Sequence, residues 1–232
     1  LQDSSAASDV YKRQVQNVVS LTSTDADSGD TVTYSITGGA DQALFEISSN
    51  TLRFKAASGA DFEDPGDVGS DNEYIVQVTA SDGANTPNTA VQTITISISD
   101  INDESPVFSS ATSVTIAENT QNAMTLAASD ADAADASVTF TVSGGADQAL
   151  FEISGDTTLR FKTNSIPNYE SSTADGGGQD YVVIVTASDG ATPANTATRT
   201  VTVTISDANE FAPVFGDADG DGESSTLSLI HI

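Results

Sequence analysis

Apolar and polar residues alternate with a period of two in several short segments of the chain. The clearest cases are TVTYSI at residues 31–36, TITISIS at 93–99, SVTFTV at 137–142 and VTVTIS at 201–206. Such alternation places one face of a strand in a core and the other face in water. Clusters of Gly, Asp and Asn separate these segments, as expected for turns. The pattern predicts an all-β chain of antiparallel β-sandwiches, with no segment that has convincing helical spacing.

The chain repeats itself with a period of about 106 residues. GGADQALFEIS at residues 38–48 recurs at 144–154, and VTASDG at 78–83 recurs at 185–190. That period is the size of a whole domain and too long for one unit of a solenoid. The repeat therefore predicts two tandem domains with equivalent cores. In the first domain the expected core residues are Val32, Tyr34, Ile36, Leu44, Phe45, Ile47, Leu52, Phe54, Tyr74, Val76, Val78, Ile94, Ile96 and Ile98.

The two ends of the chain have a separate explanation. SSAASDVYKRQ at residues 4–14 and LSLIHI at residues 227–232 back-translate into one adaptor of transposase-based sequencing libraries, read in opposite orientations. We interpret the chain as a metagenomic fragment of a longer protein, with adaptor-derived scars at 1–14 and 227–232 that carry no information on the fold. Between the scars we expect a truncated first repeat with its linker at 15–103, a second repeat at 104–210, and an acidic linker or the start of a further module at 211–226.

The composition disfavours several kinds of chemistry. The chain has 34 acidic and 7 basic residues, a net charge of -27 at pH 7, no Cys, and one His, His231, inside the C-terminal scar. Without His or Cys between the scars, histidine-based catalysis, thiol catalysis and zinc binding through these residues are disfavoured, and disulfides are excluded. The negative charge opposes binding to nucleic acids and to anionic membranes. It suits hard cations held by carboxylates.

Five motifs in order give the chain its resemblance to a known family. DINDESPVF at residues 100–108 resembles the D-x-N-D-x-x-P-x-F junction between cadherin repeats. The resemblance covers nearly all of residues 15–226, and residues 61–76 are most similar to bacterial cadherin-like repeats. The other four motifs are D-x-D at 25–27 and 130–132, A-x-D at 80–82 and 187–189, a D-R-E-like motif at 61–63, and the first-strand glutamate motif at 117–119.

The resemblance implies two tandem Greek-key immunoglobulin-like β-sandwiches of the cadherin-like type. It also implies that the first sandwich lacks its N-terminal strand. TSVTIAENTQNAM at residues 112–124 precedes the Asp-Ala-Asp of the second repeat, whereas only VQN at residues 15–17 follows the scar in the first. The first repeat has therefore also lost the counterpart of Glu118.

Acidic residues cluster where the two repeats meet in sequence. Calcium takes about six to eight oxygen ligands, which two domain ends and a linker can supply together. A bound ion would neutralise carboxylates that otherwise repel one another and would fix the angle between the repeats. The alternative for these residues is a solvated acidic surface. By resemblance to cadherins, the ligands expected at the junction are Asp61, Glu63, Ile101, Asn102, Asp103, Glu104, Asp130, Asp132 and Asp189, with Ile101 and Glu104 contributing backbone carbonyls.

Two further groups are expected to be half-sites that neighbouring repeats would complete. The second group departs from the family pattern, because Asn168 stands where the family has Asp and Glu210 replaces the usual Asp. The complete junction departs as well, since loss of the counterpart of Glu118 is expected to weaken it. The half-site residues are Asp25, Asp27 and Asp82 in the first repeat, and Glu118, Glu170, Asn209 and Glu210 in the second.

Two other interpretations of the acidic residues have less support. DADGDG at residues 217–222 fits the first half of an EF-hand-type calcium loop. Its closing glutamate would fall inside the C-terminal scar, and a flexible acidic linker fits equally well. Asp61 and Glu63 also resemble a pair of glycosidase carboxylates. Residues two apart on one strand share a face, however, which suits metal ligands equally.

The leading hypothesis is a calcium-stiffened spacer in a large extracellular or cell-surface protein of cell adhesion, and not an enzyme. The expected partners are calcium and neighbouring repeats of the same chain, with other cadherin-like domains or polysaccharide as further candidates and no nucleic acid. The alternative is a β-sandwich module that itself binds carbohydrate or protein. Carbohydrate sites usually expose aromatic side chains, and the Tyr and Trp residues between the scars are only Tyr34, Tyr74, Tyr169 and Tyr181.

Overall fold

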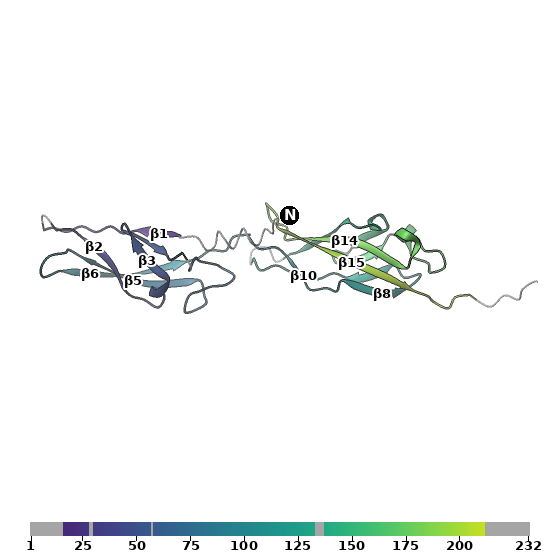
Figure 1. Ribbon diagram of the computed structural model, residues 1–232, viewed down its shortest axis with the longest axis horizontal. Helices are drawn as coiled ribbons and strands as arrows, with labels where there is room; N and C mark the ends of the chain where they lie inside the picture. Colours follow the sequence, from purple (N-terminus) through teal and green to yellow (C-terminus); the bar gives the residue numbers. More distant parts are fainter. Residues whose placement is uncertain (1–15, 28–29, 57, 133–136, 212–232) are drawn as a thin grey trace, which may run out of the picture.

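Two β-sandwiches lie end to end along the longest axis of the molecule, joined by one extended linker (Figure 1). The computed structural model describes residues 16–27, 30–56, 58–132 and 137–211. No helix in these ranges is long and apolar enough to cross a membrane. The helical segments described are single 3-10 turns: η1 (Gln42–Leu44), η2 (Gln148–Leu150), η3 (Thr163–Ser165) and η4 (Asp175–Gly177).

Repeat one, the sandwich before the linker, consists of two three-stranded sheets. One sheet has the order β1-β4-β3 and the other has the order β2-β5-β6, and every pair is antiparallel. Its longest pair joins β5 and β6 over nine residues, from Glu73↔Ser97 to Ser81↔Thr89. The strands are β1 (Asn17–Ser20), β2 (Thr33–Gly38), β3 (Phe45–Ser48), β4 (Thr51–Phe54), β5 (Glu73–Ser81) and β6 (Thr89–Ser97).

Repeat two has the same plan with additional strands. Its sheets have the orders β11-β14-β15-β8, β12-β13-β9 and β10-β7. All pairs are antiparallel except β8, which runs parallel to β15. The strands are β7 (Val107–Phe108), β8 (Ser113–Ala117), β9 (Asn122–Thr125), β10 (Ala128–Ser129), β11 (Thr139–Gly144), β12 (Phe151–Ser154), β13 (Thr158–Phe161), β14 (Asp180–Ser188) and β15 (Thr196–Ser206).

Each sandwich is built around the same group of three aromatic side chains. In repeat one the rings of Phe45 and Phe54 lie 4.4 Å apart, and Tyr74 meets Phe54 edge to face at 5.1 Å. In repeat two Phe151, Phe161 and Tyr181 repeat this arrangement, with the first two rings 4.2 Å apart and Tyr181 5.1 Å from Phe161. All six are buried. The predicted cores therefore form, and the aromatic part of the core is duplicated with the sequence.

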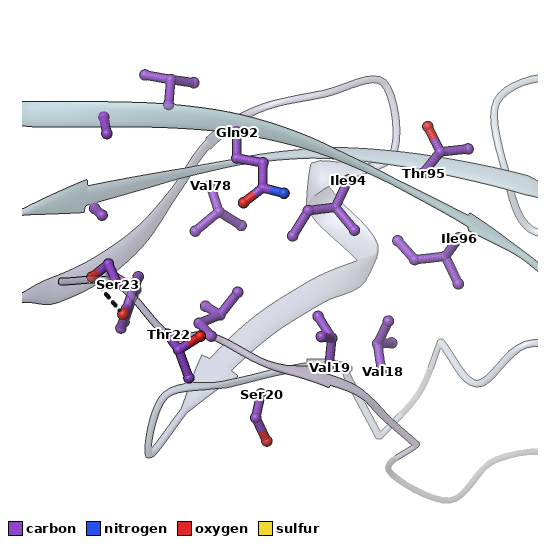
Figure 2. Close-up of a pocket in the computed structure, with 15 residues that line it drawn as sticks. Val18, Val19, Ser20, Thr22, Ser23, Val78, Gln92, Ile94, Thr95 and Ile96 are labelled. Atoms are coloured by element: carbon purple, nitrogen blue, oxygen red, sulfur yellow. Dashed lines mark hydrogen bonds between the residues drawn. The ribbon is translucent and has the colours of Figure 1, made fainter.

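The outer part of the core differs from the prediction in repeat one. Ile94, Ile96 and Ile98 were expected inside, but they are only half-buried. Their counterparts one period later are Val201, Val203 and Ile205, which are 0%, 0% and 2% exposed. In repeat two β8 covers β15, whereas no strand covers the same side of β6 in the described part of repeat one. Within residues 16–99, the described part of the first sandwich, no strand therefore takes the place that β8 has in repeat two. Figure 2 shows the cavity of about 770 Å³ that lies between β1 and β6 at this place.

Among the buried aspartates, one equivalent pair, Asp41 and Asp147, ties a loop to a strand in each repeat. The carboxylate of Asp41 accepts hydrogen bonds from the backbone N–H groups of Val68 and Ile75, both at 2.7 Å. Asp147 does the same with Asp175 at 2.7 Å and Val182 at 2.6 Å. A buried carboxylate needs such donors to offset its loss of water. The two aspartates therefore tie a long loop to the neighbouring strand.

Candidate metal centre at the repeat junction

Hydrogen bonds fix the linker against the near end of repeat two. The backbone N–H of Glu104 donates to Oδ2 of Asp132 at 3.1 Å. The side-chain amide of Asn102 donates to the carbonyl of Pro193 at 3.0 Å, and the amide of Asn195 donates to the carbonyl of Asn102 at 3.2 Å. Residues 100–104 thus lie beside the Asp-Ala-Asp turn and the loop after β14, which the sequence places far apart.

Carboxylates from both repeats meet at this linker. One oxygen each of Glu63, Asp100 and Asp132 lies within 4.8 Å of the other two. Glu63 follows β4 in repeat one, whereas Asp132 follows β10 in repeat two. Glu63 also groups with Asp103 and Glu104 at the same spacing. Like charges this close disfavour one another's ionised form unless a cation compensates them.

Three buried oxygens at the junction have no hydrogen-bond donor among the described residues. They are Oδ1 of Asn102, Oδ2 of Asp130 and Oδ1 of Asp132. Asp132 is only 2% exposed. A buried acceptor without a donor or cation costs free energy, so native structures seldom contain one. Amide and carboxylate oxygens are the ligand types that calcium uses. The residues present therefore fit a bound calcium ion.

The position of Asp132 raises its pKa. Burial is the largest cause, the hydrogen bond from the N–H of Glu104 opposes the rise, and the negative charges of Asp130, Asp100 and Asp103 add to it. Both burial and negative neighbours disfavour the ionised form of this carboxyl. A divalent cation would reverse the effect of the neighbouring charges by neutralising them.

The remaining expected junction ligands are held by local backbone hydrogen bonds. Oδ1 of Asp61 accepts from the N–H groups of Glu63 and Asp64, both at 3.2 Å, and so shapes the turn that carries Glu63. Oδ1 of Asp130 accepts from the N–H of Asp132 at 3.0 Å. Exposed Ile101 lines a cavity of about 270 Å³ together with Asp61, Glu63 and Asp103. These residues are at the junction, although Asp61 and Asp130 are outside the two carboxylate groups.

Asp189 has a structural role in the loop that follows β14. Its two carboxylate oxygens accept hydrogen bonds from the N–H groups of Ala191 at 3.0 Å and Asn195 at 2.8 Å. Burial raises the pKa of Asp189, but the bonds from Asn195 and Ala191, with the amide of Asn102, outweigh it and leave the pKa below its ordinary value. Asp189 thereby holds the loop that contacts the linker. It lies outside the carboxylate groups described above.

Two details of the junction were not foreseen from the sequence. Asp100 was not among the predicted ligands, yet its carboxylate lies within 4.8 Å of Glu63 and Asp132. Its position at the start of the DINDESPVF motif is the sequence feature that could have identified it as a junction residue. Glu104 was given only a backbone role, but its side-chain carboxylate also groups with Glu63 and Asp103. The junction therefore gathers more carboxylates than the prediction contained.

Three of the residues expected as a half-site at the far end of repeat two lie close together. Carboxylate oxygens of Glu118, Glu170 and Glu210 lie within 4.8 Å of one another. Glu118 is buried, and it accepts hydrogen bonds from the N–H groups of Tyr169 and Ala208, both at 2.8 Å. These bonds, the one from Tyr169 first, hold the pKa of Glu118 below its ordinary value. The fourth expected member, Asn209, is exposed.

The half-site at the start of repeat one is more open. Asp25, Asp27 and Asp30 form a group of exposed carboxylates within 4.8 Å. Asp30 was not expected, although it follows Asp27 closely. Asp82 is buried and lies with Asp25 on a separate cavity of about 180 Å³. Its carboxylate accepts bonds from Ala84 and Asn88, as Asp189 does one period later. The EF-hand-type loop expected at 217–222 lies outside the described residues.

Comparisons with known proteins agree with this arrangement. A model of the cadherin domain family matches residues 11–99 and 112–206, one match for each repeat. Human Protocadherin Fat 1 is 30% identical over 198 residues, which are 83% of this chain and 4% of that protein. Human Protocadherin-16 is 32% identical over 151 residues, which are 63% of this chain and 4% of that protein. The chain thus spans only a small part of the curated relatives that it matches.

Solved structures show the same architecture. Mouse Cadherin-23 EC22-24 superposes with a TM-score of 0.58 at 23% identity, covering 83% of this chain and 59% of that one. Drosophila N-cadherin EC1-4 superposes with a TM-score of 0.63 at 20% identity, covering 82% and 44%. At these identities the likeness shows the fold alone, which is that of tandem cadherin domains.

Proposed function

The chain belongs to the cadherin domain family, and from this premise we propose that it is a calcium-stiffened spacer in an extracellular adhesion protein. The observation that carries the proposal is the set of buried acceptor oxygens on Asn102, Asp130 and Asp132. They lie where carboxylates of both repeats converge on one linker. A site with this composition is suited to a hard divalent cation.

The junction residues explain why a bound cation would stiffen the connection between the two repeats. A short polar linker connects the repeats, and its residues Asn102 and Glu104 form hydrogen bonds with repeat two. Glu63 is the carboxylate that repeat one brings to both groups. Calcium would hold Glu63 of repeat one together with Asp132 of repeat two. Without it, the same charges favour separation or bending of the two ends.

The chain is placed outside the cell because its homologues are extracellular cadherin domains. The solved protocadherin gammaB7 EC3-6 forms a cis-dimer. We include in the proposal that neighbouring repeats, and cadherin domains of other molecules, are the partners of this chain, and that it has no catalytic role. The carbohydrate alternative has lost support. Tyr74 and Tyr181, two of the four aromatic candidates, are buried in the two cores.

The first test is thermal unfolding of the whole chain in EDTA and in millimolar calcium. Asp132→Asn removes a junction carboxylate, and Asp156→Asn is the matched control in an exposed hairpin turn of the same repeat. A ligand that binds only the folded state stabilises it by about 2.7 kcal/mol at about a hundred times its Kd. We expect calcium to raise the Tm of the parent and of Asp156→Asn, and to raise that of Asp132→Asn much less.

Small-angle X-ray scattering provides the second readout, because stiffness is a property of shape. Calcium should narrow the distribution of end-to-end distances in the parent and leave it broad in Asp132→Asn. Identical melting and identical scattering with and without calcium would refute both the site and the spacer mechanism. A rise in Tm without a change in shape would retain the site and reject the stiffening.

A further inference from the structure

Two asparagines, Asn102 in the linker and Asn195 in the loop after β14, form a reciprocal contact that we call the asparagine pair. The side-chain amide of Asn102 donates to the carbonyl of Pro193 at 3.0 Å, and the side-chain amide of Asn195 donates to the carbonyl of Asn102 at 3.2 Å. Asn102 is thereby held through its side chain and through its backbone. All the groups in these two bonds are uncharged, so the contact needs no metal ion.

The loop presents Asn195 from a fixed backbone. The N–H of Asn195 donates to the carboxylate of Asp189 at 2.8 Å, and the N–H of Asp189 donates to the carbonyl of Asn195 at 3.3 Å. Asp189 is 1% exposed and also accepts from the N–H of Ala191 at 3.0 Å. A buried carboxylate with several backbone donors fixes the loop that contains them. The side chain of Asn195 therefore reaches the linker from a defined position.

Repeat one contains the same loop with a different use of its asparagine. Asp82 accepts from the N–H of Asn88, six residues later, at 3.0 Å. Backbone N–H groups of this loop lower the pKa of Asp82, and the side-chain amide of Asn88 adds to the effect. In repeat two burial raises the pKa of Asp189, and the side-chain amide that helps to lower it belongs to Asn102. The linker asparagine thus takes the place that the loop's own asparagine has in repeat one, while Asn195 turns to the linker.

The asparagine pair also fixes the direction of the Asn102 side chain. Its amide nitrogen faces two acceptors, the carbonyl of Pro193 and the carboxylate of Asp189. The two ends of a carboxamide differ in chemistry, since the nitrogen donates and the oxygen accepts. With the nitrogen held there, Oδ1 of Asn102 is buried and has no hydrogen-bond donor among the described residues. That oxygen is the atom that Asn102 would offer to a hard cation.

The carboxylate that repeat one brings to the junction depends on a cation, whereas the asparagine pair does not. Oxygens of Glu63, Asp100 and Asp132 lie within 4.8 Å of one another, so they repel when no cation is bound. Neutral amide–carbonyl bonds carry no net charge and are not weakened by this repulsion. We therefore expect the metal-free linker to stay with repeat two and to separate from Glu63.

We propose that Asn195 is a positioning residue of the junction, which holds Asn102 and the linker on repeat two before any cation binds. A cation would then find Asn102 and Asp132 already in place, and its binding would order repeat one against a fixed linker. Groups that are ordered in advance bind more tightly, because less entropy is lost on binding. The effect on affinity rests on the proposed calcium site, whereas the attachment of the linker does not.

The attachment is tested on the whole chain in EDTA with Asn195→Ala. This variant removes the side-chain donor to the linker and keeps the backbone N–H that donates to Asp189. The readout is hydrogen exchange of the Glu104 N–H by NMR, because that group donates to Asp132 while the linker lies on repeat two. We expect exchange about tenfold faster than in the parent. Asn88→Ala makes the same change in the equivalent loop of repeat one and should leave this exchange within about twofold.

Calorimetric titration of the calcium-free chain with calcium tests the positioning role. Asn195→Ala should raise the Kd of the tightest binding about tenfold, and Asn88→Ala should leave it within about twofold. Thermal unfolding in EDTA separates positioning from a purely structural role, since Asn195→Ala should keep the Tm of the parent there.

Three results would overturn the inference. Unchanged exchange of the Glu104 N–H in Asn195→Ala would show that the linker does not depend on this contact. Faster exchange with an unchanged Kd would reject the positioning role, and a lower Tm in EDTA would assign Asn195 to the stability of repeat two instead. Absence of calcium binding by the parent would refute the proposed function and with it the effect on affinity, and the exchange result then decides on the attachment alone.

Discussion

Strands β6 and β15 have closely similar sequences and different surroundings. TITISIS in repeat one and TVTVTIS in repeat two alternate in the same way, and each is the partner of the long strand before it. The apolar residues of the quoted segment are buried in repeat two, while those of its counterpart in repeat one are half-buried. The added β8 accounts for the contrast. Alternation specifies which side of a strand faces the core, but the burial of that side depends on strands distant in sequence.

The two ends of repeat two also differ in how their buried carboxylates are satisfied. At its near end, Asp132 is buried, its Oδ1 lacks a donor although its Oδ2 has one, and its neighbours are negative. At its far end, Glu118 is equally buried, but backbone N–H groups from Tyr169 and Ala208 satisfy it. A carboxylate with a backbone donor on each oxygen is stable in its ionised form, whereas one with a single donor and negative neighbours favours a proton or a cation.

The largest effect we expect should be the same in both repeats. Phe161→Ala and Phe54→Ala each remove a buried ring from the aromatic group of three, and each should cost about 3–5 kcal/mol of unfolding free energy. Urea denaturation followed by circular dichroism measures both. A much smaller cost for Phe54→Ala would show that the absent strand loosens even the centre of repeat one.

The next effect should differ between the repeats. Val203→Ala removes two methyl groups from a fully buried site and should cost about 2–3 kcal/mol. Ile96→Ala removes more atoms from a half-buried one and should cost only about 1–2 kcal/mol. Equal or reversed costs, measured by urea denaturation in EDTA, would contradict the interpretation that β8 alone produces the difference in burial.

A change in pH should affect the two ends of repeat two in opposite directions. The folded-state pKa of Glu118 lies below its ordinary value of 4.5. The stability it contributes is therefore present above that value and lost as the pH falls through the lowered pKa. Glu118→Gln should lower the Tm at neutral pH and flatten the loss of stability on the acid side.

In EDTA, the stability that Asp132 contributes should change with pH in the opposite direction. Its folded-state pKa is raised above 3.8. Its favourable contribution is therefore complete below that value and is lost as the pH rises through the raised pKa. Asp132→Asn should remove this loss, so that the Tm of the variant in EDTA falls less between pH 4 and pH 7 than that of the parent. The same sign of change in both variants would contradict the contrast between the two ends.

The smallest effect concerns a surface ion pair present in both repeats. Arg53 pairs with Glu46 and Arg160 pairs with Glu152, each at 2.8 Å and about one third exposed. Exposed pairs contribute about 0.2–1 kcal/mol and are screened by salt. Arg160→Gln and Arg53→Gln should therefore shift urea midpoints slightly, and equally, at low salt. A larger cost in one repeat would show that its pair also supports packing.

The sequence by itself determined the class of the fold and the place of the candidate site. Period-two alternation identified the strands, and recurrence after about 106 residues identified two equivalent sandwiches around Phe54 and Phe161. The order of the motifs placed the acidic residues at the junction. These features are local or repetitive, so residue spacing alone reveals them.

Only the tertiary structure decided which oxygens share one site and which apolar residues are covered. Glu63 and Asp132 are far apart in the chain, and their approach depends on how the linker binds repeat two. Asp100 joins them because it begins the linker that follows β6 (Thr89–Ser97). The different burial of Ile96 and Val203 likewise depends on β8, which pairs with a strand about ninety residues away. Such contacts arise from the packing of distant segments, which a local pattern does not contain.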